Sequence, residues 1–372
     1  MFDITKPHND LIPITHLVIE DSKSLQKLAE ETRVAIEILN YAVYSLPEPS
    51  LILDTLALQE AKVSSDIENI VTTNDDLYKG VVFGDFSAEA KEVANYKTAL
   101  FIGYRQYQTK KIISLGDIEA INDPVNKKRK GIRANLPNFE GDLTHIANIR
   151  ADGTEEIIYT PPHGEALLRT LLIDMLDFIY NDDEYTLHPL IKIALAHYQF
   201  ECIHPFYDGN GRTGRILNIL FLCQKGYLSY PVLYASSFII RNKNEYYSLL
   251  QQCNATGEYE SIIDYMLKSF KITAQQTLKI VEAIQEMVIH YSSDDFLNTL
   301  KGQKLELGKV IALIFKKVYV RIGDLNMVHR QTASTYLKQL VDKGLLVEEK
   351  VGREKLYKNV KLLELFEGEK QK

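Results

Sequence analysis

Long apolar runs, cysteine and tryptophan are what this chain of 372 residues has least of. The longest stretch without a charged residue, Gly226–Ile240, is interrupted by a proline and three serines, and it falls short of the roughly 18 apolar residues that span a bilayer. We therefore expect no membrane-spanning helix and no membrane partner. The three cysteines, Cys202, Cys223 and Cys253, have apolar neighbours and are too few for a disulfide scaffold or a zinc site.

The first residues also lack a secretory signal. Met1–Lys6 contains neither a basic segment nor the apolar stretch that would follow it. Together with the scarcity of cysteine, this favours a reducing compartment, and we expect a cytoplasmic protein. A content of 45% hydrophobic and 25% charged residues excludes a disordered chain and is sufficient for at least one large core.

The formal net charge of −7 is unevenly distributed along the chain. Residues 301–372 hold 16 basic and 9 acidic residues, whereas residues 1–300 hold 27 basic and 41 acidic residues. A basic C-terminal unit is therefore joined to an acidic body.

Apolar residues recur three and four positions apart over most of the first 290 residues, which predicts helices that each bury one face. We expect the body to be mainly α-helical. The segments with this spacing are Ser24–Tyr44, Leu51–Glu68, Ala88–Tyr107, His163–Tyr180, His188–Cys202, Gly214–Lys225, Asn244–Ala255 and Glu260–His290.

A β-hairpin is predicted at the one segment that breaks the helical pattern. Between Leu143 and Tyr159, short apolar stretches flank the sequence Arg150-Ala151-Asp152-Gly153, and Asp-Gly is a strong hairpin signal. Because an isolated hairpin is only marginally stable in water, we expect this one to lean on the helical body.

The basic C-terminal unit follows a polar segment, Tyr291–Lys304, that has the composition of a linker. We predict three helices and then two strands, over Leu307–Lys317, Arg321–Met327, Arg330–Asp342, Leu345–Glu349 and Lys355–Lys358. This order resembles a winged helix-turn-helix, a fold that binds DNA in some proteins and other proteins elsewhere. In that fold, the exposed face of the third helix would carry Arg330, Gln331, Ser334 and Lys338, and its buried face Ala333, Tyr336, Leu337 and Leu340.

The segment that points to chemistry is Ile203–Arg215, which reads Ile-His-Pro-Phe-Tyr-Asp-Gly-Asn-Gly-Arg-Thr-Gly-Arg. It joins two predicted helices, so its glycines lie just before or within the first turn of the second helix. Backbone N–H groups at such a terminus are unpaired, the helix dipole is positive there, and glycine lets an anion approach closely. The segment therefore predicts a cradle for phosphate groups.

Four side chains near this cradle have roles if the anion is a nucleotide. Asp208 can hold a hard divalent cation through oxygen. Arg212 and Arg215 lie three apart in the first turns of the helix and can offer fork-shaped contacts to phosphate. His204, on the other flank of the loop, can accept a proton near neutral pH.

The full order His-Pro-Phe-x-Asp-Gly-Asn-Gly-Arg-x-x-Arg has nine specified positions, and its chance occurrence in a chain of this length is on the order of one in a billion. The sequence resembles the Fic (filamentation induced by cAMP) family, whose signature it matches at all nine positions. The resemblance implies a helical Fic fold with a β-hairpin flap and a C-terminal winged helix-turn-helix. The implied domains are an N-terminal helical region over 1–110, a catalytic core over 111–290 and the winged helix over 305–372.

The resemblance implies a protein adenylyltransferase, which moves AMP from ATP to a Ser, Thr or Tyr hydroxyl of a target protein or of itself. His204 would be the general base, and Asp208 would ligate Mg²⁺. The remaining residues implied to contact the nucleotide are Gly209, Asn210 and Gly211 through their backbone, Arg212 at the β-phosphate, Arg215 at the γ-phosphate, and Thr213 and Gly214 at the start of the helix. Tyr247, rather than Tyr246, would border the adenine.

Partners follow from the same resemblance. The hairpin would pair with an extended segment of the target protein by strand addition. DNA is a second partner, through the winged helix. The sequence leaves the oligomeric state open, a homodimer included.

A second motif lies far upstream, at Ser64–Asn69. It resembles the inhibitory pattern of the family, a Ser or Thr followed four residues later by Glu and then by Gly or Asn. Ser64 and Glu68 lie on one helical face, and Asn69 tolerates the left-handed conformation that ends a helix. The resemblance implies that Glu68 pairs with Arg215 and keeps this arginine from the γ-phosphate.

Three alternatives compete with protein adenylylation. A phosphotransferase branch that binds ATP inverted has Lys at the position of Gly211 and lacks the second arginine, so Arg215 argues against it. Removal of AMP from a target is a second alternative, because a glutamate at position 68 can also orient a water. The third is a transcriptional regulator whose body senses nucleotide for the winged helix.

Overall fold

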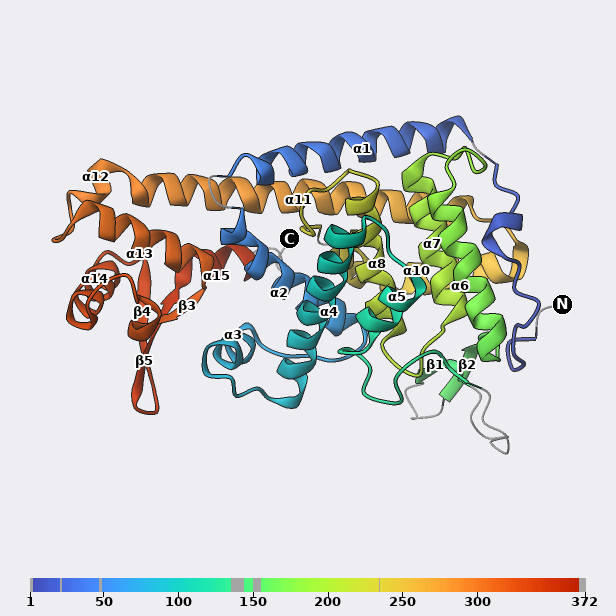
Figure 1. Ribbon diagram of the computed structural model, residues 1–372, viewed down its shortest axis with the longest axis horizontal. Helices are drawn as coiled ribbons and strands as arrows, with labels where there is room; N and C mark the ends of the chain where they lie inside the picture. The colour runs from blue at the N-terminus through green and yellow to red at the C-terminus, as the bar shows by residue number, and fades with distance from the viewer. Residues whose placement is uncertain are drawn as a thin grey trace.

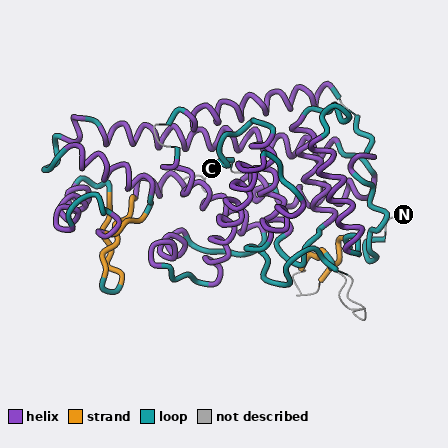
Figure 2. Tube along the Cα trace, in the orientation of Figure 1, coloured by secondary structure: helices purple, strands orange, loops and turns teal. Residues whose placement is uncertain are grey.

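The protein is mainly α-helical in a computed structural model that describes residues 3–20, 22–46, 49–134, 144–149, 155–233 and 235–367. This confirms the fold class predicted from apolar periodicity. In Figure 2, helices make up most of the trace, and strands occur in two small groups. Within the described ranges, none of the helices combines the length and the apolar character needed to cross a bilayer.

The elements of the body occupy the first 297 residues. They are η1 (Ile14–His16), α1 (Lys23–Tyr44), α2 (Ser50–Ile67), α3 (Asn74–Phe83), α4 (Ala88–Lys110), α5 (Leu115–Asn122), β1 (Ile146–Ile149), β2 (Glu155–Tyr159), α6 (Glu165–Tyr180), α7 (Pro189–Ile203), α8 (Asn210–Gln224), α9 (Ala235–Arg241), α10 (Lys243–Thr256), α11 (Glu260–Ser292) and α12 (Asp294–Leu297). The C-terminal unit holds α13 (Lys304–Lys316), β3 (Tyr319–Arg321), η2 (Ile322–Asp324), α14 (Arg330–Asp342), β4 (Leu346–Val351), β5 (Glu354–Asn359) and α15 (Val360–Glu367).

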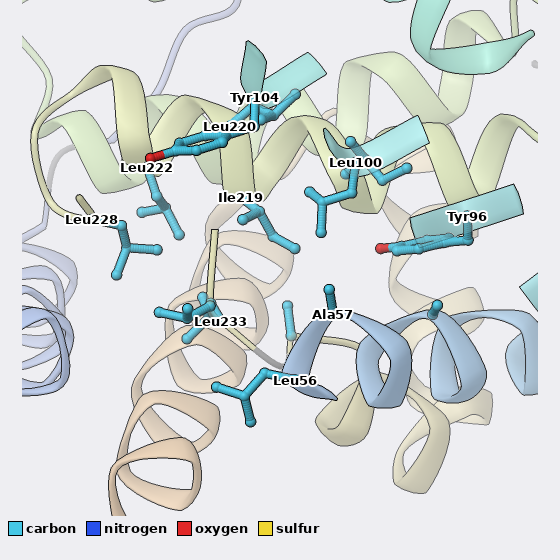
Figure 3. Close-up of a cluster of buried hydrophobic side chains, with 14 of the residues drawn as sticks. Leu56, Ala57, Tyr96, Leu100, Tyr104, Ile219, Leu220, Leu222, Leu228 and Leu233 are labelled. Atoms are coloured by element: carbon cyan, nitrogen blue, oxygen red, sulfur yellow. The ribbon is translucent and has the colours of Figure 1, made fainter. Parts of the chain in front are cut away.

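The core of the body surrounds the pair α7 and α8. Nearly every side chain of α7 and α8 is buried, as expected for helices enclosed on all sides. Helix α1 packs along α11, and α11 runs from the body to the C-terminal unit (Figure 1). A cluster of apolar side chains joins α2, α4 and α8, with Leu56, Leu100 and Ile219 among its members (Figure 3).

The predicted hairpin is present as β1 and β2, which pair antiparallel. Its proposed turn, Arg150–Gly153, lies outside the described residues. The hairpin leans on the body as expected, because the buried Tyr159 hydroxyl donates a hydrogen bond of 2.9 Å to the Cys202 carbonyl of α7.

In the C-terminal unit, the prediction of a helix over Arg321–Met327 was wrong. Tyr319–Arg321 forms a strand that pairs with β5, and only Ile322–Asp324 makes a short 3-10 turn. The sheet therefore has three strands in the order β3-β5-β4. The apolar face of the third predicted helix is confirmed, because the four predicted side chains of α14 are all buried: Ala333, Tyr336, Leu337 and Leu340.

Several short elements escaped the periodicity analysis. Helices α3, α5, α9, α12 and α15 have between 4 and 10 residues, too few for a repeating apolar pattern to stand out. Residues 291–304 are only partly a linker, because α11 continues to Ser292 and α12 follows.

Candidate active site

The loop between α7 and α8 begins with a strained residue. His204 caps α7 in the left-handed conformation, with φ 46°, which is uncommon for a residue other than glycine. Such strain persists only where the surroundings hold it. Here the buried Arg133 donates from Nε to the His204 carbonyl at 2.9 Å and from Nη2 to the Pro162 carbonyl at 2.9 Å.

Two asparagines hold the rest of the loop. Asn210 accepts the Phe206 N–H at 2.8 Å and donates back to the Phe206 carbonyl at 2.9 Å. Asn122 of α5 donates to the carbonyl of Asp208 and to the hydroxyl of Thr213. The side chains of Arg133 and Asn122 were not found from the sequence, because they contact backbone far along the chain and belong to no local motif.

Helix α8 starts at Asn210, four residues earlier than its apolar pattern predicted. Gly209 precedes it with φ 75°, a conformation that glycine adopts without strain. A Cβ on Gly211 would lie 2.4 Å from Glu68 Oε1 and 3.0 Å from Arg215 Nη1. Glycine at 211 therefore lets a carboxylate approach the first turn of α8, as expected of an anion cradle.

Glu68 occupies this cradle together with Arg215. Arg215 is 1% exposed and donates from Nη2 to Glu68 Oε1 at 2.7 Å. Its Nε donates to Ser64 Oγ at 2.8 Å, and Nη2 also donates to the Ser64 carbonyl at 2.9 Å. Burial disfavours the Glu68 anion, but the pairing with Arg215 outweighs burial and lowers the pKa of this carboxyl.

Asp208 and Arg212 contact each other at the start of α8. Asp208 accepts the Gly209 N–H at Oδ1 and the Lys127 N–H at Oδ2. Arg212 is buried, and its nearest carboxylates, Glu92 and Asp208, are each 3.5 Å away. Its Nε is buried and has no hydrogen-bond partner among the described residues.

His204 is poised to accept a proton. Burial and the nearby Arg133 charge lower the pKa of His204 to about 4, so the imidazole is neutral at pH 7. Its Nδ1 has no hydrogen-bond partner in the described part of the chain. A neutral imidazole can act as a general base where an imidazolium cannot.

A cavity of about 110 Å³ lies against part of this site, but Asp208 and Arg212 are not among the residues that line it. Its lining includes Glu68, His204, Gly211, Arg215 and the partly buried Tyr247.

Thr213 and Gly214 of the motif do not line the cavity, whereas Tyr246 of α10 does. Thr213 is buried and donates to the Gly209 carbonyl at 2.8 Å. Gly214 packs against α7, where a Cβ would meet Glu201 Oε1 at 2.6 Å. Tyr246 is 1% exposed, and its hydroxyl lies 2.8 Å from His197 Nε2.

Two further residues of α7 lie near the site. His197 is buried, and its ring nitrogens lie 2.8 Å from the Tyr246 hydroxyl and 3.1 Å from Asn218 Nδ2. Glu201 lines the cavity, and its Oε1 has no partner among the described residues. Burial raises the pKa of Glu201 to about 7.

The described residues contain no group of three or more His, Cys, Asp or Glu side chains placed to hold a metal ion. Asp208 alone would be a weak site. One carboxylate is nevertheless what Mg²⁺ commonly takes from a protein when substrate phosphates and water supply its other ligands. The position of Asp208 beside the cradle fits that arrangement.

Three family profiles match the chain. Residues 26–105 match the Fic/DOC family N-terminal domain, residues 117–222 the Fic/DOC family domain, and residues 304–362 the C-terminal domain described as protein adenylyltransferase SoFic-like. The two Fic/DOC profiles together cover half of the chain.

Curated relatives match part of the chain. "Protein adenylyltransferase fic-1" of Caenorhabditis elegans is 29% identical over 141 residues, which are 38% of this chain and 25% of that protein. "Protein adenylyltransferase Fic" of Drosophila yakuba is 38% identical over 93 residues, which are 25% of this chain and 18% of that protein. The match thus spans about a quarter or less of the length of these relatives.

Solved structures share the fold. A Fic family protein from Desulfovibrio desulfuricans superposes with a TM-score of 0.55 at 18% identity, covering 92% of this chain and 98% of that chain. Fic-1 from C. elegans superposes with a TM-score of 0.50 at 20% identity, covering 70% of this chain and 74% of that chain. The helical Fic fold, with its hairpin, is therefore confirmed, and the chain belongs to the Fic/DOC family.

Proposed function

We propose that the chain is a protein adenylyltransferase that transfers AMP from ATP to a hydroxyl side chain. One observation carries the proposal: a carboxylate, Glu68, lies against Gly211 and Arg215 at the N-terminus of α8, where a phosphate would be bound. His204 opens into the same cavity. The relatives named as protein adenylyltransferases support the same reaction.

The chemical step follows from this arrangement. The target hydroxyl oxygen attacks the α-phosphorus and forms a new P–O bond, while the bond to the β-phosphate bridging oxygen breaks and pyrophosphate leaves. His204 takes the hydroxyl proton. Arg212, Arg215 and the N–H groups of the cradle stabilise the negative charge on the phosphates, which is the main requirement of phosphoryl-type transfer.

Asp208 is the residue that would hold Mg²⁺ at the nucleotide phosphates. The ion would neutralise charge on the phosphates and on the departing pyrophosphate. The chain contributes the orientation of the carboxylate, because backbone N–H groups of Gly209 and Lys127 fix both oxygens of Asp208.

Inhibition belongs to the same proposal. Glu68 and a γ-phosphate would compete for the donors of Arg215, since charge-assisted bonds to a guanidinium are strong for both anions. The wild type should therefore be a slow enzyme at rest. Loss of Glu68 should release it.

The target would dock beside the hairpin. A groove of about 890 Å³ runs along β2 and is lined by Glu156, Tyr159 and, from α10, Gln251. An extended segment of a target could add to a hairpin strand through backbone hydrogen bonds, which position a hydroxyl without demanding much sequence.

The direct test is mass spectrometry of a cell lysate incubated with ATP and the Glu68→Gly variant. Proteins that gain an adenylyl group on Ser, Thr or Tyr would support the proposal. The proposal would be contradicted if neither the lysate proteins nor the Glu68→Gly variant gains an adenylyl group at saturating ATP and Mg²⁺. Incubation with a previously adenylylated target distinguishes removal of AMP, since that reaction would return the unmodified protein.

Arg215→Ala should weaken binding of ATP more than binding of ADP, because only ATP has a γ-phosphate for this arginine. The comparison is best made in the Glu68→Gly background by calorimetry, so that an unpaired Glu68 does not confound it. A lost charge-assisted contact predicts a loss on the order of 10-fold or more for ATP. Equal losses for both nucleotides would show that Arg215 does not contact the γ-phosphate.

We propose DNA binding by the C-terminal unit as a second function, on one specific observation. A groove between η2, the start of α14 and the β4–β5 turn is lined by Arg321, Arg330, Arg353 and Lys355. Arg330 and Arg353 form no ion pair with any residue that the structure describes. Free arginines beside a helix N-terminus suit backbone phosphates, and the exposed face of α14 suits a major groove.

Fluorescence anisotropy with a mixed-sequence DNA duplex tests this function. Arg330→Ala with Arg353→Ala should weaken binding and reduce the salt dependence by about one unit of slope per arginine. The matched control removes two exposed lysines of the body, Lys27 and Lys268. Equal affinity for the arginine variant and the lysine control would exclude the groove as a DNA site.

A further inference from the structure

The helix that carries Glu68 is enclosed on all sides. Every residue from Thr55 to Lys62 is buried, which is two full turns of α2. A helix that exposes no face has neighbours all round it. The body supplies α4 and α9, and the C-terminal unit supplies α13 (Figure 1).

On the body side, α2 is held by polar as well as apolar contacts. The buried Glu60 accepts hydrogen bonds from the Ser236 backbone N–H at 3.3 Å and from the Tyr96 hydroxyl at 3.2 Å. Nearer to Glu68, the Lys243 ammonium donates to the Ile67 carbonyl at 2.5 Å.

On the opposite side, the C-terminal unit closes over α2 and α3 together. Leu58 of α2 and Tyr78 of α3 line one cavity with Val318 and Tyr319 of the unit, and all four side chains are buried. The rings of Tyr78 and Tyr319 lie 5.5 Å apart between centroids. Gln59 links the two helices by donating to the Tyr78 hydroxyl at 2.8 Å.

A network of charges joins α3 to the sheet of the unit. Asp75 Oδ1 forms an ion pair with Lys358 Nζ at 2.7 Å and accepts a hydrogen bond from the Tyr319 hydroxyl at 2.6 Å. Lys79 reaches Glu349 Oε1 at 2.7 Å. Although partial burial of Asp75 favours its neutral form, Lys358, Lys79 and Tyr319 together hold the pKa of its carboxyl well below the ordinary value.

The inhibitory segment Ser64–Asn69 lies between these two anchored regions. Helix α3 begins at Asn74, so five residues separate Glu68 from the helix that the charge network fixes. Withdrawal of Glu68 from the cradle requires movement of the end of α2 or of this short link. Helix α2 packs against α13 of the C-terminal unit, and the link ends at α3, which contacts β3 of the unit.

We propose that the C-terminal unit holds Glu68 in the cradle, so that loosening the unit from α2 and α3 releases Arg215 and activates adenylyl transfer. The enzymatic readout rests on the proposed function. The restraint that the C-terminal unit places on Glu68 does not rest on that function. It can be measured as the protection of the amides of residues 64–69 from hydrogen exchange.

The experiment breaks the charge network and follows both quantities. Lys358→Glu places a third carboxylate beside Asp75 and Glu349. We expect faster hydrogen exchange at the amides of residues 64–69, and adenylyl transfer faster by about 5-fold or more, the lower end of ordinary coupling between sites. In the Glu68→Gly background, Lys358→Glu should add no further increase in rate, because the inhibitor is already absent.

Two further variants serve as controls. Asp75→Lys combined with Lys358→Glu restores opposite charges across the interface and should return exchange and rate toward the wild type. Lys350→Glu makes the same charge change at an exposed residue of β4, and should leave both unchanged. Thermal unfolding of each variant distinguishes a weakened contact between the unit and the body from unfolding of the unit. Asp75→Lys alone disrupts the same contacts from the side of α3.

The outcomes separate the two proposals. Unchanged exchange over residues 64–69 in both Lys358→Glu and Asp75→Lys would overturn the hold. The proposal would also be overturned if Lys358→Glu speeds hydrogen exchange but the rate of adenylyl transfer rises by the same factor in the Lys350→Glu control. If Glu68→Gly modifies no protein at all, the proposed function fails, while the exchange measurement still decides whether the unit holds the segment.

Discussion

Glu68→Gly should raise the rate of adenylyl transfer by roughly 10²-fold, the size associated with one charge-stabilising donor at a reaction centre. The reason is the 2.7 Å contact between Glu68 Oε1 and Arg215 Nη2, which occupies a donor that a γ-phosphate needs. The glycine also removes the side chain that crowds Gly211. The measurement is transfer of labelled AMP from ATP, to the protein itself or to lysate proteins, at several ATP concentrations.

Two companion variants separate charge from bulk. Glu68→Gln keeps the shape of the side chain and loses its charge, so it should also activate, but less if the amide still accepts a bond from Arg215. Glu68→Gly with Arg215→Ala should be inactive, because the released arginine is then missing. A wild type as fast as Glu68→Gly at every ATP concentration would show that the contact does not inhibit.

His204→Ala should nearly abolish transfer, with a loss of about 10²–10⁴ in rate, the usual contribution of a general base. Affinity for ATP should stay within a few-fold of the parent, because the cradle, Arg212 and Arg215 hold the phosphates and His204 only flanks them. The comparison belongs in the Glu68→Gly background, where the rate is high enough to measure a loss. Transfer that survives in the double variant would remove His204 from the mechanism.

The pH dependence of the Glu68→Gly variant provides a second measure of the same base. His204 must be unprotonated to accept the hydroxyl proton, and its pKa is lowered to about 4. A depressed pKa extends the active range downward, so His204 should impose no loss of kcat/KM between about pH 6 and 8, and a loss only as the pH falls toward its pKa. A histidine-dependent inflection near 6.5, the ordinary value, would contradict the buried, neutral imidazole.

The location of the candidate site was predictable because its motif is compact in sequence. His204, Asp208, Arg212 and Arg215 lie within two turns of one loop and helix, so their spacing alone places them together. The contact between Glu68 and Arg215 spans 147 positions and was predicted only through the resemblance of Ser64–Asn69 to a known inhibitory pattern.

The supports of the site were not predictable in the same way. Arg133 holds the strained His204 by donating to backbone carbonyl groups. Every residue has such a carbonyl, so the sequence does not show which one a donor will contact. Only the fold shows that Arg133 supplies the donors to these carbonyls.

The error at Arg321–Met327 has a similar cause. Seven residues show too few periods to separate a helix from other structure. Tyr319–Arg321 pairs with β5, and this long-range pairing overrides the local pattern, as tertiary context commonly does. The same strand carries Tyr319 into the contact with α3, so the missed element is part of the interface that bounds the inhibitory segment.

Ser64 gives Arg215 a support that does not depend on Glu68. Its hydroxyl and carbonyl accept from Nε and Nη2 of the guanidinium, and a long side chain held in this way has already lost most of the rotamer freedom that binding would remove. Truncation of Glu68 leaves that support in place, so the Arg215 side chain is already ordered when ATP binds. Displacement of α2 would carry Ser64 away as well, and Arg215 would then have to be ordered by the nucleotide. A protein activated by movement of the helix should consequently bind ATP more weakly than one activated by substitution at position 68, even when Glu68 is equally distant in both.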